Sequence, residues 1–205
     1  MDKLYYISQG NTAEEHLKNI KIVCESGVKW VQLRLKNVDM ATYLETALEC
    51  RSICDDFDVV MIINDNISIA QACQADGVHL GLSDESPKKA REILGNNFII
   101  GATANTLNDC LTHIKNGVDY IGLGPYRFTE TKKRLSPVLG ITGYENIISK
   151  LNKEGHKVPI VAIGGILEKD FKNLYKTGIS CVAVSGLLTG KNTDTIQNTI
   201  AKVIA

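Results

Sequence analysis

Charged and amide side chains stand at the ends of several short apolar runs in this sequence, where they could act on a charged ligand. Gln32, Arg34 and Lys36 alternate along one such run, so an extended chain would point all three to the same side. Asp65 closes the next run, and Asp84 comes shortly after a third. Two carboxylates beside two cations suit Mg²⁺ and a phosphorylated ligand, because Mg²⁺ keeps few protein ligands and takes phosphate oxygens for the others.

Each of these residues has a simpler interpretation when it is taken alone. An Arg-x-Lys pair is usually a solvated strand edge, because charged side chains are mostly exposed. Asp65 and Asp84 each stand just before a helical pattern, where an aspartate commonly caps the helix. The occurrence of all four charges together favours the metal and phosphate interpretation.

The longest interruption of the apolar rhythm is residues 124–134, which precede a predicted helix. Connections of this length in compact domains are usually functional lids. Thr129, Thr131 and Lys132 lie in this segment, and their hydroxyl and cationic groups suit an oxyanion. We therefore expect an anion-binding loop here, although a basic exposed loop alone would indicate little.

Strand and helix patterns alternate along the whole chain. Continuous apolar residues, as in residues 59–63, are typical of strands that are buried on both faces of a parallel sheet. The sequence predicts strands at residues 4–8, 30–36, 59–65, 77–80, 98–102, 120–124, 160–166 and 181–185. It predicts helices at residues 12–26, 40–54, 67–74, 86–94, 107–115, 144–153, 169–176 and 193–204.

Eight consecutive strand–helix units predict an α/β protein, a single-domain (β/α)₈ TIM barrel over residues 1–205. A doubly wound sheet is the alternative, but residues 7–11 lack the glycine spacing of a dinucleotide-binding turn. In a TIM barrel the carboxyl ends of all strands meet at one face, where the chemistry collects. We therefore expect the charged residues described above to meet at one pocket mouth.

Glycines mark the ends of the last two predicted strands, at Gly164 and Gly165 within the end of the seventh and at Gly186, which follows Ser185 at the end of the eighth. Glycine lets backbone N–H groups approach a ligand, and the loops after strands seven and eight are the recurrent phosphate site of this fold. A pair of ordinary tight turns is the other interpretation. Because the glycines recur at this location, we expect a phosphate monoester there.

Other chemistry has weaker support in the sequence. His79 lies inside a predicted strand, where a histidine is more often a hydrogen-bonded part of the barrel wall than a catalytic base. No nucleophile elbow and no lysine within a strand core stand out. The six cysteines form no Cys-x-x-Cys pair and are expected to be ordinary buried thiols.

Composition excludes several classes of partner. Twenty-three basic and 23 acidic residues give a net charge of zero, which argues against nucleic-acid binding through bulk positive charge. No apolar run approaches the roughly 18 residues of a membrane span, and residues 1–9 begin with a strand-like run instead of a leader. We expect a cytoplasmic protein with small-molecule partners, and a homo-oligomer is compatible with the sequence but not indicated by it.

In their order along the chain, these motifs resemble the thiamine phosphate synthase family over nearly the whole length. The matching stretches are Gln-Leu-Arg-Leu-Lys at 32–36, Ile-Asn-Asp at 63–65, Ala-Asp-Gly-Val-His-Leu-Gly at 75–81 with Asp84, Asp-Tyr-Ile-Gly-Leu-Gly-Pro at 119–125, Thr-Glu-Thr-Lys-Lys at 129–133, Ala-Ile-Gly-Gly-Ile at 162–166 and Val-Ala-Val-Ser at 182–185. The resemblance implies a transferase that couples hydroxymethylpyrimidine diphosphate to a thiazole phosphate. Its products would be thiamine phosphate and diphosphate, with Mg²⁺ as the cofactor.

The resemblance also implies roles for individual residues. Arg34, Lys36 and Lys132 would be the catalytic cations, and Asp65 and Asp84 would bind Mg²⁺. The substrate-binding residues would be Gln32, Leu33, Arg34, Leu35, Lys36, Asn64, Thr103, Thr129, Glu130, Thr131, Lys132, Gly165, Val184 and Ser185. The family mechanism is dissociative, so that diphosphate leaves first and the thiazole nitrogen then captures a pyrimidine-methyl cation.

Three positions depart from the family pattern: Asn66 where Arg is common, Leu82 where Gln is frequent, and Arg127 in a loop that is usually more apolar. None of them removes an expected metal or phosphate ligand. Two alternatives remain open. A thiazole tautomerase of the same superfamily would need no diphosphate or metal apparatus, and a phosphate-ligand sensor would keep the pocket without turnover.

Overall fold

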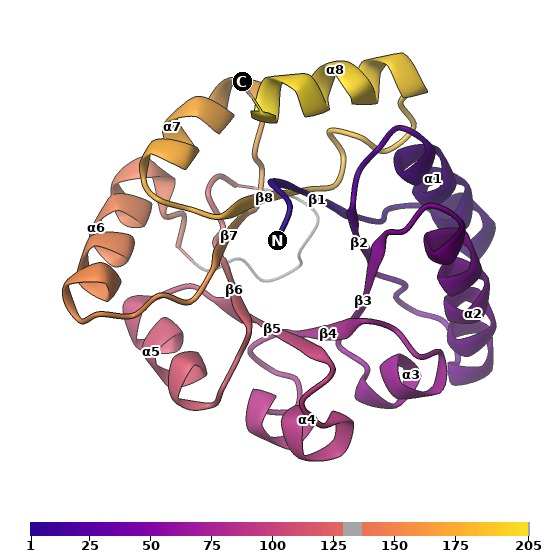
Figure 1. Ribbon diagram of the computed structural model, residues 1–205, viewed down its shortest axis with the longest axis horizontal. Helices are drawn as coiled ribbons and strands as arrows, with labels where there is room; N and C mark the ends of the chain where they lie inside the picture. Colours follow the sequence, from indigo (N-terminus) through magenta and orange to yellow (C-terminus); the bar gives the residue numbers. More distant parts are fainter. Residues whose placement is uncertain (129–136, 205) are drawn as a thin grey trace.

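The computed structural model describes residues 1–128 and 137–204, which form a closed ring of eight parallel strands surrounded by helices (Figure 1). In ring order the strands are β1 (Leu4–Ile7), β2 (Trp30–Leu33), β3 (Val60–Asn64), β4 (Gly77–Leu80), β5 (Ile99–Ala104), β6 (Tyr120–Leu123), β7 (Ile160–Ile163) and β8 (Cys181–Val184). Each strand pairs with the next in the chain, and β8 pairs with β1 to close the barrel. The predicted TIM barrel is confirmed.

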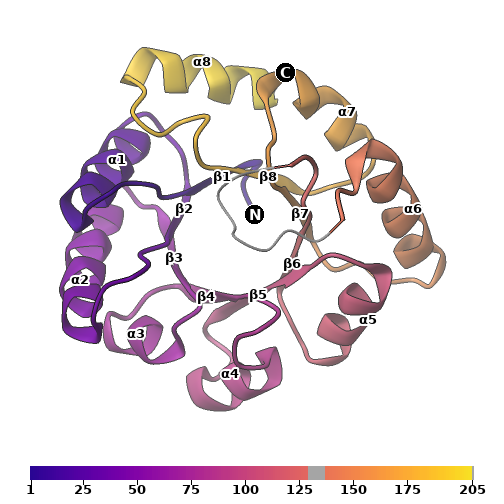
Figure 2. The same cartoon turned by 180° about the vertical axis from the view of Figure 1, so that it is seen from behind.

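A helix follows each strand and lies on the outside of the barrel. The helices are α1 (Ala13–Glu25), α2 (Met40–Asp56), α3 (Ile67–Ala72), α4 (Pro87–Leu94), α5 (Leu107–Lys115), α6 (Gly140–Lys153), α7 (Phe171–Lys176), with the short 3₁₀ turn η1 (Glu168–Asp170) before it, and α8 (Thr193–Ile204). Figure 2 shows the ring from behind, with α8 between α7 and α1. In the part of the chain that the structure describes, no helix has the length and apolar character needed to cross a membrane.

Local sequence signals explain where several helices begin. Thr12 accepts a hydrogen bond from the main chain of Glu15 at the start of α1. Ser86 caps α4, and Pro87 occupies its first position, where a missing N–H costs nothing. Helix α6 begins at Gly140, earlier than predicted, and no side chain caps it. Because glycine is a poor helix former, the sequence pattern conceals this first turn.

Apolar side chains form two layers, one between the strands and the helices and one inside the barrel. Successive residues of a strand point to opposite layers. The inner layer contains Tyr5, Ile7, Trp30, Ile62, Tyr120, Val161, Cys181 and Ala183. The rings of Tyr5, Trp30 and Tyr120 meet edge to face, with centroids 5.8 to 6.2 Å apart. All six cysteines are unpaired and buried, as expected from the sequence.

Candidate active site

Asp65 and Asp84 lie together at the carboxyl ends of β3 and β4. Asp65 follows the last residue of β3, and its main-chain N–H donates to the carbonyl of His79 in β4 at 2.8 Å. Asp84 folds back so that its Oδ2 accepts from the N–H of Gly81 at 2.7 Å. A Cβ atom built on Gly81 would lie 2.8 Å from Asp84 Oδ2 and 4.0 Å from Asp65 Oδ1. Both carboxylates therefore converge on a stretch of backbone that glycine leaves open.

The two carboxylates and Lys36 form one electrostatic cluster. Lys36 Nζ contacts Asp65 Oδ2. Burial opposes the ionisation of Asp65, but hydrogen bonds from Asp84 and Lys36 hold the pKa of Asp65 below its usual value. Burial and the neighbouring Asp65 raise the pKa of Asp84. The ionisation of one carboxylate thus opposes that of the other, as expected for like charges in a shared site.

The structure answers whether these aspartates are simple helix caps. The N-cap of α3 is Asn66, whose Oδ1 accepts from the N–H of Ile69 at 2.9 Å. The N-cap of α4 is Ser86. Asp65 and Asp84 therefore cap neither helix. Asn66, one of the three departures from the family pattern, has a structural role of its own.

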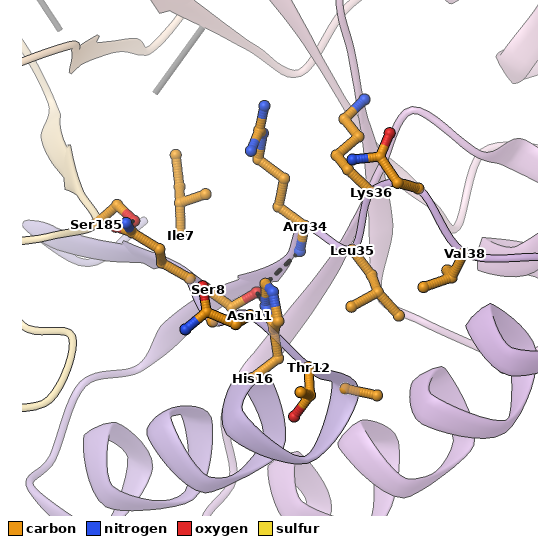
Figure 3. A pocket seen from close by; sticks show the side chains of 14 residues that line it. Ile7, Ser8, Asn11, Thr12, His16, Arg34, Leu35, Lys36, Val38 and Ser185 are labelled. Atoms are coloured by element: carbon orange, nitrogen blue, oxygen red, sulfur yellow. Dashed lines mark hydrogen bonds between the residues drawn. The ribbon is translucent and has the colours of Figure 1, made fainter. Parts of the chain in front are cut away.

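Arg34 and Lys36 follow β2 and point to the same side of the chain, whereas Leu35 between them points the other way (Figure 3). Both cations line a cavity of about 210 Å³ at the carboxyl ends of β1, β2 and β8. The other walls come from residues 7–13, which connect β1 to α1, and from Ser185 after β8. The β1–α1 segment was not predicted to be part of the site, because it carries no charged residue or phosphate-binding glycine pattern before α1.

A chain of hydrogen bonds crosses the barrel interior. Gln32 Nε2 donates to Tyr5 OH at 2.7 Å, and Tyr5 OH lies 3.2 Å from Tyr120 OH. His79 Nδ1 lies 3.0 Å from Tyr120 OH, and His79 Nε2 lies 3.0 Å from Thr103 Oγ1. Burial raises the pKa of both tyrosines, so their hydroxyls remain protonated. His79 is a hydrogen-bonded part of the barrel wall, as predicted, whereas the two tyrosines were missed because they look like core residues in an apolar strand.

The turn after β7 lies against the segment that follows β6. Gly164 and Gly165 have φ values of +97° and +66°, which other residues rarely adopt. Arg127 donates its main-chain N–H to the Gly164 carbonyl at 2.9 Å. A Cβ atom on Gly165 would lie 2.9 Å from the carbonyl oxygen of Phe128. The two glycines therefore allow the β6 segment to approach the β7 turn closely.

Ser185 follows the buried Val184, the last residue of β8, and reaches the rim of the cavity. Its Oγ donates to Gln9 Oε1 at 3.1 Å. Gln9 belongs to the β1–α1 segment, so this contact joins the ends of β8 and β1. Ser185 and Arg34 thus border the same cavity from two sides.

Arg127 has a structural partner outside the cavity. Its two terminal nitrogens donate to the two carboxylate oxygens of Asp170, at 2.9 and 3.0 Å. Asp170 is buried, and burial would raise its pKa, but the bonds from Arg127 and the Leu167 main chain hold that pKa below its usual value. This departure from the family pattern therefore fastens the segment after β6 to η1. Leu82, the third departure, is exposed.

The remaining predicted residues divide into two groups. Asn64 and Thr103 are buried at the ends of β3 and β5, Leu33 packs into the outer apolar layer, and Leu35 is buried at the cavity wall. Thr129, Glu130, Thr131 and Lys132 lie outside the described residues, so their roles stay predictions. In residues 1–128 and 137–204, no group of three or more His, Cys, Asp or Glu side chains could hold a metal ion.

A TIM barrel that gathers an acidic pair, two cations and glycine turns at the carboxyl ends of its strands belongs to the class of barrel enzymes that act on small phosphorylated molecules. Residues 4–188 match the family described as thiamine monophosphate synthase, and the chain belongs to that family. The resemblance that was seen in the sequence motifs is confirmed. Members of this family are transferases of thiamine biosynthesis, and so is this chain.

Individual relatives agree with this assignment over nearly the full length. The thiamine-phosphate synthase of Flavobacterium johnsoniae is 50% identical over 188 residues, which are 92% of this chain and 89% of that protein. The thiamine-phosphate synthase of Caldicellulosiruptor saccharolyticus is 34% identical, covering 97% of this chain and 89% of that protein. The solved structure of a thiamine phosphate pyrophosphorylase from Pyrococcus furiosus has a TM-score of 0.84 at 29% identity, and covers 99% of this chain and 97% of that one.

Proposed function

We propose that this protein couples hydroxymethylpyrimidine diphosphate to thiazole ethyl phosphate with Mg²⁺, forming thiamine phosphate and diphosphate. The observation that carries the proposal is the convergence of Asp65 and Asp84 beside Lys36, which lines a cavity together with Arg34, in a chain of this family. Such a cluster supplies the opposite charges that a diphosphate leaving group requires. A thiazole tautomerase would not need this cluster, because its reaction releases no diphosphate.

The acidic pair fits Mg²⁺. Carboxylate oxygens are the hard donors that this cation prefers, and Mg²⁺ commonly takes one or two of them together with substrate phosphate oxygens. Asp65 helps to hold the pKa of Asp84 above its usual value, and a divalent cation bound by the pair would favour the ionised form of both carboxylates. Bound Mg²⁺ would neutralise the charge that grows on the diphosphate as it leaves.

The cations of the chain would hold the diphosphate from the other side. Arg34 has a planar guanidinium that can bind two phosphate oxygens at once. Lys36, which contacts Asp65, would lie between the metal site and the diphosphate. Lys132 is proposed as the third catalytic cation. Fixed positive groups in a site that excludes water stabilise developing negative charge most effectively, because no solvent has to reorganise during the reaction.

The pyrimidine end of this substrate would lie against Gln32, Asn64 and Thr103. The side chains of Leu33 and Leu35 pack into the outer apolar layer, so these two residues would contribute through their main chain. Gln32 is held by Tyr5, and Thr103 by His79. These polar groups are therefore oriented before the substrate arrives, which lowers the entropy cost of a reactive geometry.

The thiazole phosphate would lie against the turns after β7 and β8. Gly165, Val184 and Ser185 would bind it on the side of the described turns, and Thr129, Glu130 and Thr131 on the side of the loop. Ser185 borders the cavity that Arg34 also lines. The two substrates would thus be held at adjacent anchors, with their reacting atoms between them.

The proposed reaction is dissociative. The bond between the pyrimidine methylene carbon and the diphosphate oxygen breaks first, and its electron pair leaves with the diphosphate. The thiazole nitrogen then supplies the electron pair of the new carbon–nitrogen bond. No protein nucleophile takes part, in keeping with six buried cysteines. Their unpaired thiols also support a cytoplasmic location.

The direct test is to mix the purified protein with both substrates and Mg²⁺ and to measure thiamine phosphate by mass spectrometry. We expect the product with Mg²⁺ and none when a chelator replaces it. Asp65→Ala and Asp84→Ala should abolish the Mg²⁺-dependent coupling and stay folded, whereas the control Asp56→Ala, at an exposed residue near the end of α2, should react normally. Tight binding of either substrate by the wild type without product would instead indicate a sensor. Unchanged turnover of either site variant would remove that residue from the metal site.

A further inference from the structure

Two buried polar residues that the proposed function does not use lie beside Arg34. Ser8 directly follows β1, and His16 belongs to the first turns of α1. Ser8 Oγ lies 2.7 Å from His16 Nδ1 and accepts the main-chain N–H of Arg34 at 3.0 Å. The side chains of both residues line the cavity, as the sticks in Figure 3 illustrate, although Ser8 is only 2% exposed and His16 only 5%.

These contacts, together with the burial of His16, favour one protonation of the pair. Since Ser8 Oγ accepts from Arg34, its own hydroxyl proton is available to His16 Nδ1. When Ser8 donates this proton to Nδ1, His16 is neutral and carries its ring proton on Nε2. Burial lowers the pKa of His16 below its usual value, and the nearby Arg34 charge lowers it further while the Gly10 carbonyl opposes the shift. A neutral His16 that accepts a hydrogen bond agrees with this direction.

The hydroxyl of Ser8 replaces a main-chain acceptor where the β1–β2 ladder ends. Ser8 N–H donates to the Gln32 carbonyl at 2.9 Å, which is the normal pairing between the two strands. The next N–H on that edge, from Arg34, bonds to the Ser8 side chain. The main chain of Ser8 is therefore free to turn into the β1–α1 segment while Arg34 stays fixed. Without the hydroxyl, the Arg34 N–H would lose this partner.

The segment after Ser8 is packed too closely to compensate by moving toward α1. A Cβ atom on Gly10 would lie 2.8 Å from Glu15 Cβ and 2.9 Å from the main-chain nitrogen of His16. His16 thus has Gly10 on one side and Ser8 on the other, and both come from the chain that borders the cavity. His16 therefore lies against Gly10 and contacts the Ser8 hydroxyl that accepts from the Arg34 main chain.

We propose that His16 is a positioning residue for the diphosphate substrate, which acts through Ser8 to fix the main chain of Arg34 so that its guanidinium faces the cavity. The inference rests on the proposed function only in the identity of the ligand that Arg34 binds. It assigns a role in substrate binding to the β1–α1 segment. The thiazole phosphate, held by other residues, should be insensitive to this contact.

The test compares steady-state constants of four variants with those of the wild type, using thiamine phosphate as the measured product. His16→Leu and Ser8→Ala should each raise the KM for the pyrimidine diphosphate by about tenfold, the factor that corresponds to about 1.4 kcal/mol. The KM for the thiazole phosphate should change by no more than about twofold. His16→Asn should restore most of the lost affinity, because its amide oxygen can take the place of Nδ1 as an acceptor. Ser26→Ala, which removes a similarly buried hydroxyl at the other end of α1, is the matched control and should change neither constant.

Three results would overturn the proposal: an unchanged KM for the diphosphate in Ser8→Ala, an equal rise of both KM values, or a His16→Asn variant that behaves like His16→Leu. If His16→Leu fails to fold, Ser8→Ala and His16→Asn still decide the question. The double variant Ser8→Ala/His16→Asn should be no worse than Ser8→Ala alone, since both residues act through one contact. Absence of product in the wild type would refute the proposed function instead, and is therefore distinguishable from failure of this inference.

Discussion

Gly81→Ala offers a sharp test of the acidic pair, because it changes one carbon atom beside the two carboxylates. The added Cβ would lie 2.8 Å from Asp84 Oδ2, well inside van der Waals contact. Gly81 does not have a positive φ, so alanine fits its backbone without strain. The atom that must move is the end of the Asp84 side chain, which can rotate, and not the main chain of the barrel.

The size of the effect follows from that contact. To reach an ordinary separation of about 3.5 Å, Asp84 Oδ2 must retreat by roughly 0.7 Å, and misplacement of a reacting group by about 1 Å can cost about 100-fold in rate. The bond from Gly81 N–H to Asp84, 2.7 Å long in the wild type, would also weaken. A net hydrogen bond contributes about 1 kcal/mol. We therefore expect the free energy of unfolding to fall by no more than about 1 kcal/mol. The rate of thiamine phosphate formation should fall between about 10- and 100-fold.

The assay is thiamine phosphate formation over a Mg²⁺ titration, together with thermal unfolding of the same preparation. Gly81→Ala should need more Mg²⁺ for half-maximal rate, whereas Ser83→Ala, at an exposed position in the same loop, should match the wild type. Wild-type rate and Mg²⁺ dependence in Gly81→Ala would show that the position of the Asp84 carboxylate does not control Mg²⁺ binding. A similar loss of rate in Ser83→Ala would show that the loop as a whole, and not the Asp84 carboxylate, is responsible.

Three further predictions concern the helix cap, the buried ion pair and the two anchors. Asn66→Ala should lower the free energy of unfolding in urea by about 1 kcal/mol, because α3 loses its N-cap, whereas Asn66→Ser should retain most of it; an unaltered stability of the alanine variant would deny the cap any contribution. Arg127→Ala removes the charged partner of the buried Asp170, which keeps only the hydrogen bond from the Leu167 main chain, and should cost about 1 to 3 kcal/mol. The folded-state pKa of Asp170 is lowered, so the ion pair stabilises the wild type above the unfolded-state pKa of about 3.9. This stabilisation is lost as the pH falls toward the folded-state pKa. If Arg127→Ala loses stability in acid as steeply as the wild type, the ion pair is not the cause of that loss. Finally, Arg34→Ala should chiefly raise the KM for the pyrimidine diphosphate and Ser185→Ala that for the thiazole phosphate, and the reverse pattern would mean that the two anchors are exchanged.

The strand order was predictable because a buried parallel strand has a strong local signature. Residues 59–63 are apolar throughout, and glycines after the helices mark most of the turns. Element ends were less predictable. The seventh strand ends at Ile163, before the predicted residue 166, because Gly164 and Gly165 adopt positive φ values that break the strand. Such a conformation is allowed by glycine but not required by it, so sequence alone could not specify it.

Charged residues of the site were predictable from the sequence, whereas some of its uncharged residues were not. Asp65 and Asp84 stood out as carboxylates at strand ends, but the choice between cap and ligand depended on Asn66 and Ser86, which the structure identifies as the caps. His16 gave no comparable signal. Its spacing from Ser8 becomes meaningful only when the β1–α1 segment folds back, and that contact is tertiary.

The role of the acidic pair in Mg²⁺-dependent coupling is tested by measuring thiamine phosphate and released diphosphate together in one reaction, for the wild type and for Asp84→Ala, as Mg²⁺ is varied. We expect the wild type to form the two products in equal amounts and only with Mg²⁺, and Asp84→Ala to form neither at Mg²⁺ concentrations that saturate the wild type. Product formation by Asp84→Ala equal to that of the wild type would contradict a metal-binding role for Asp84. Diphosphate release by the wild type without thiamine phosphate, when both substrates are present, would contradict the coupling reaction.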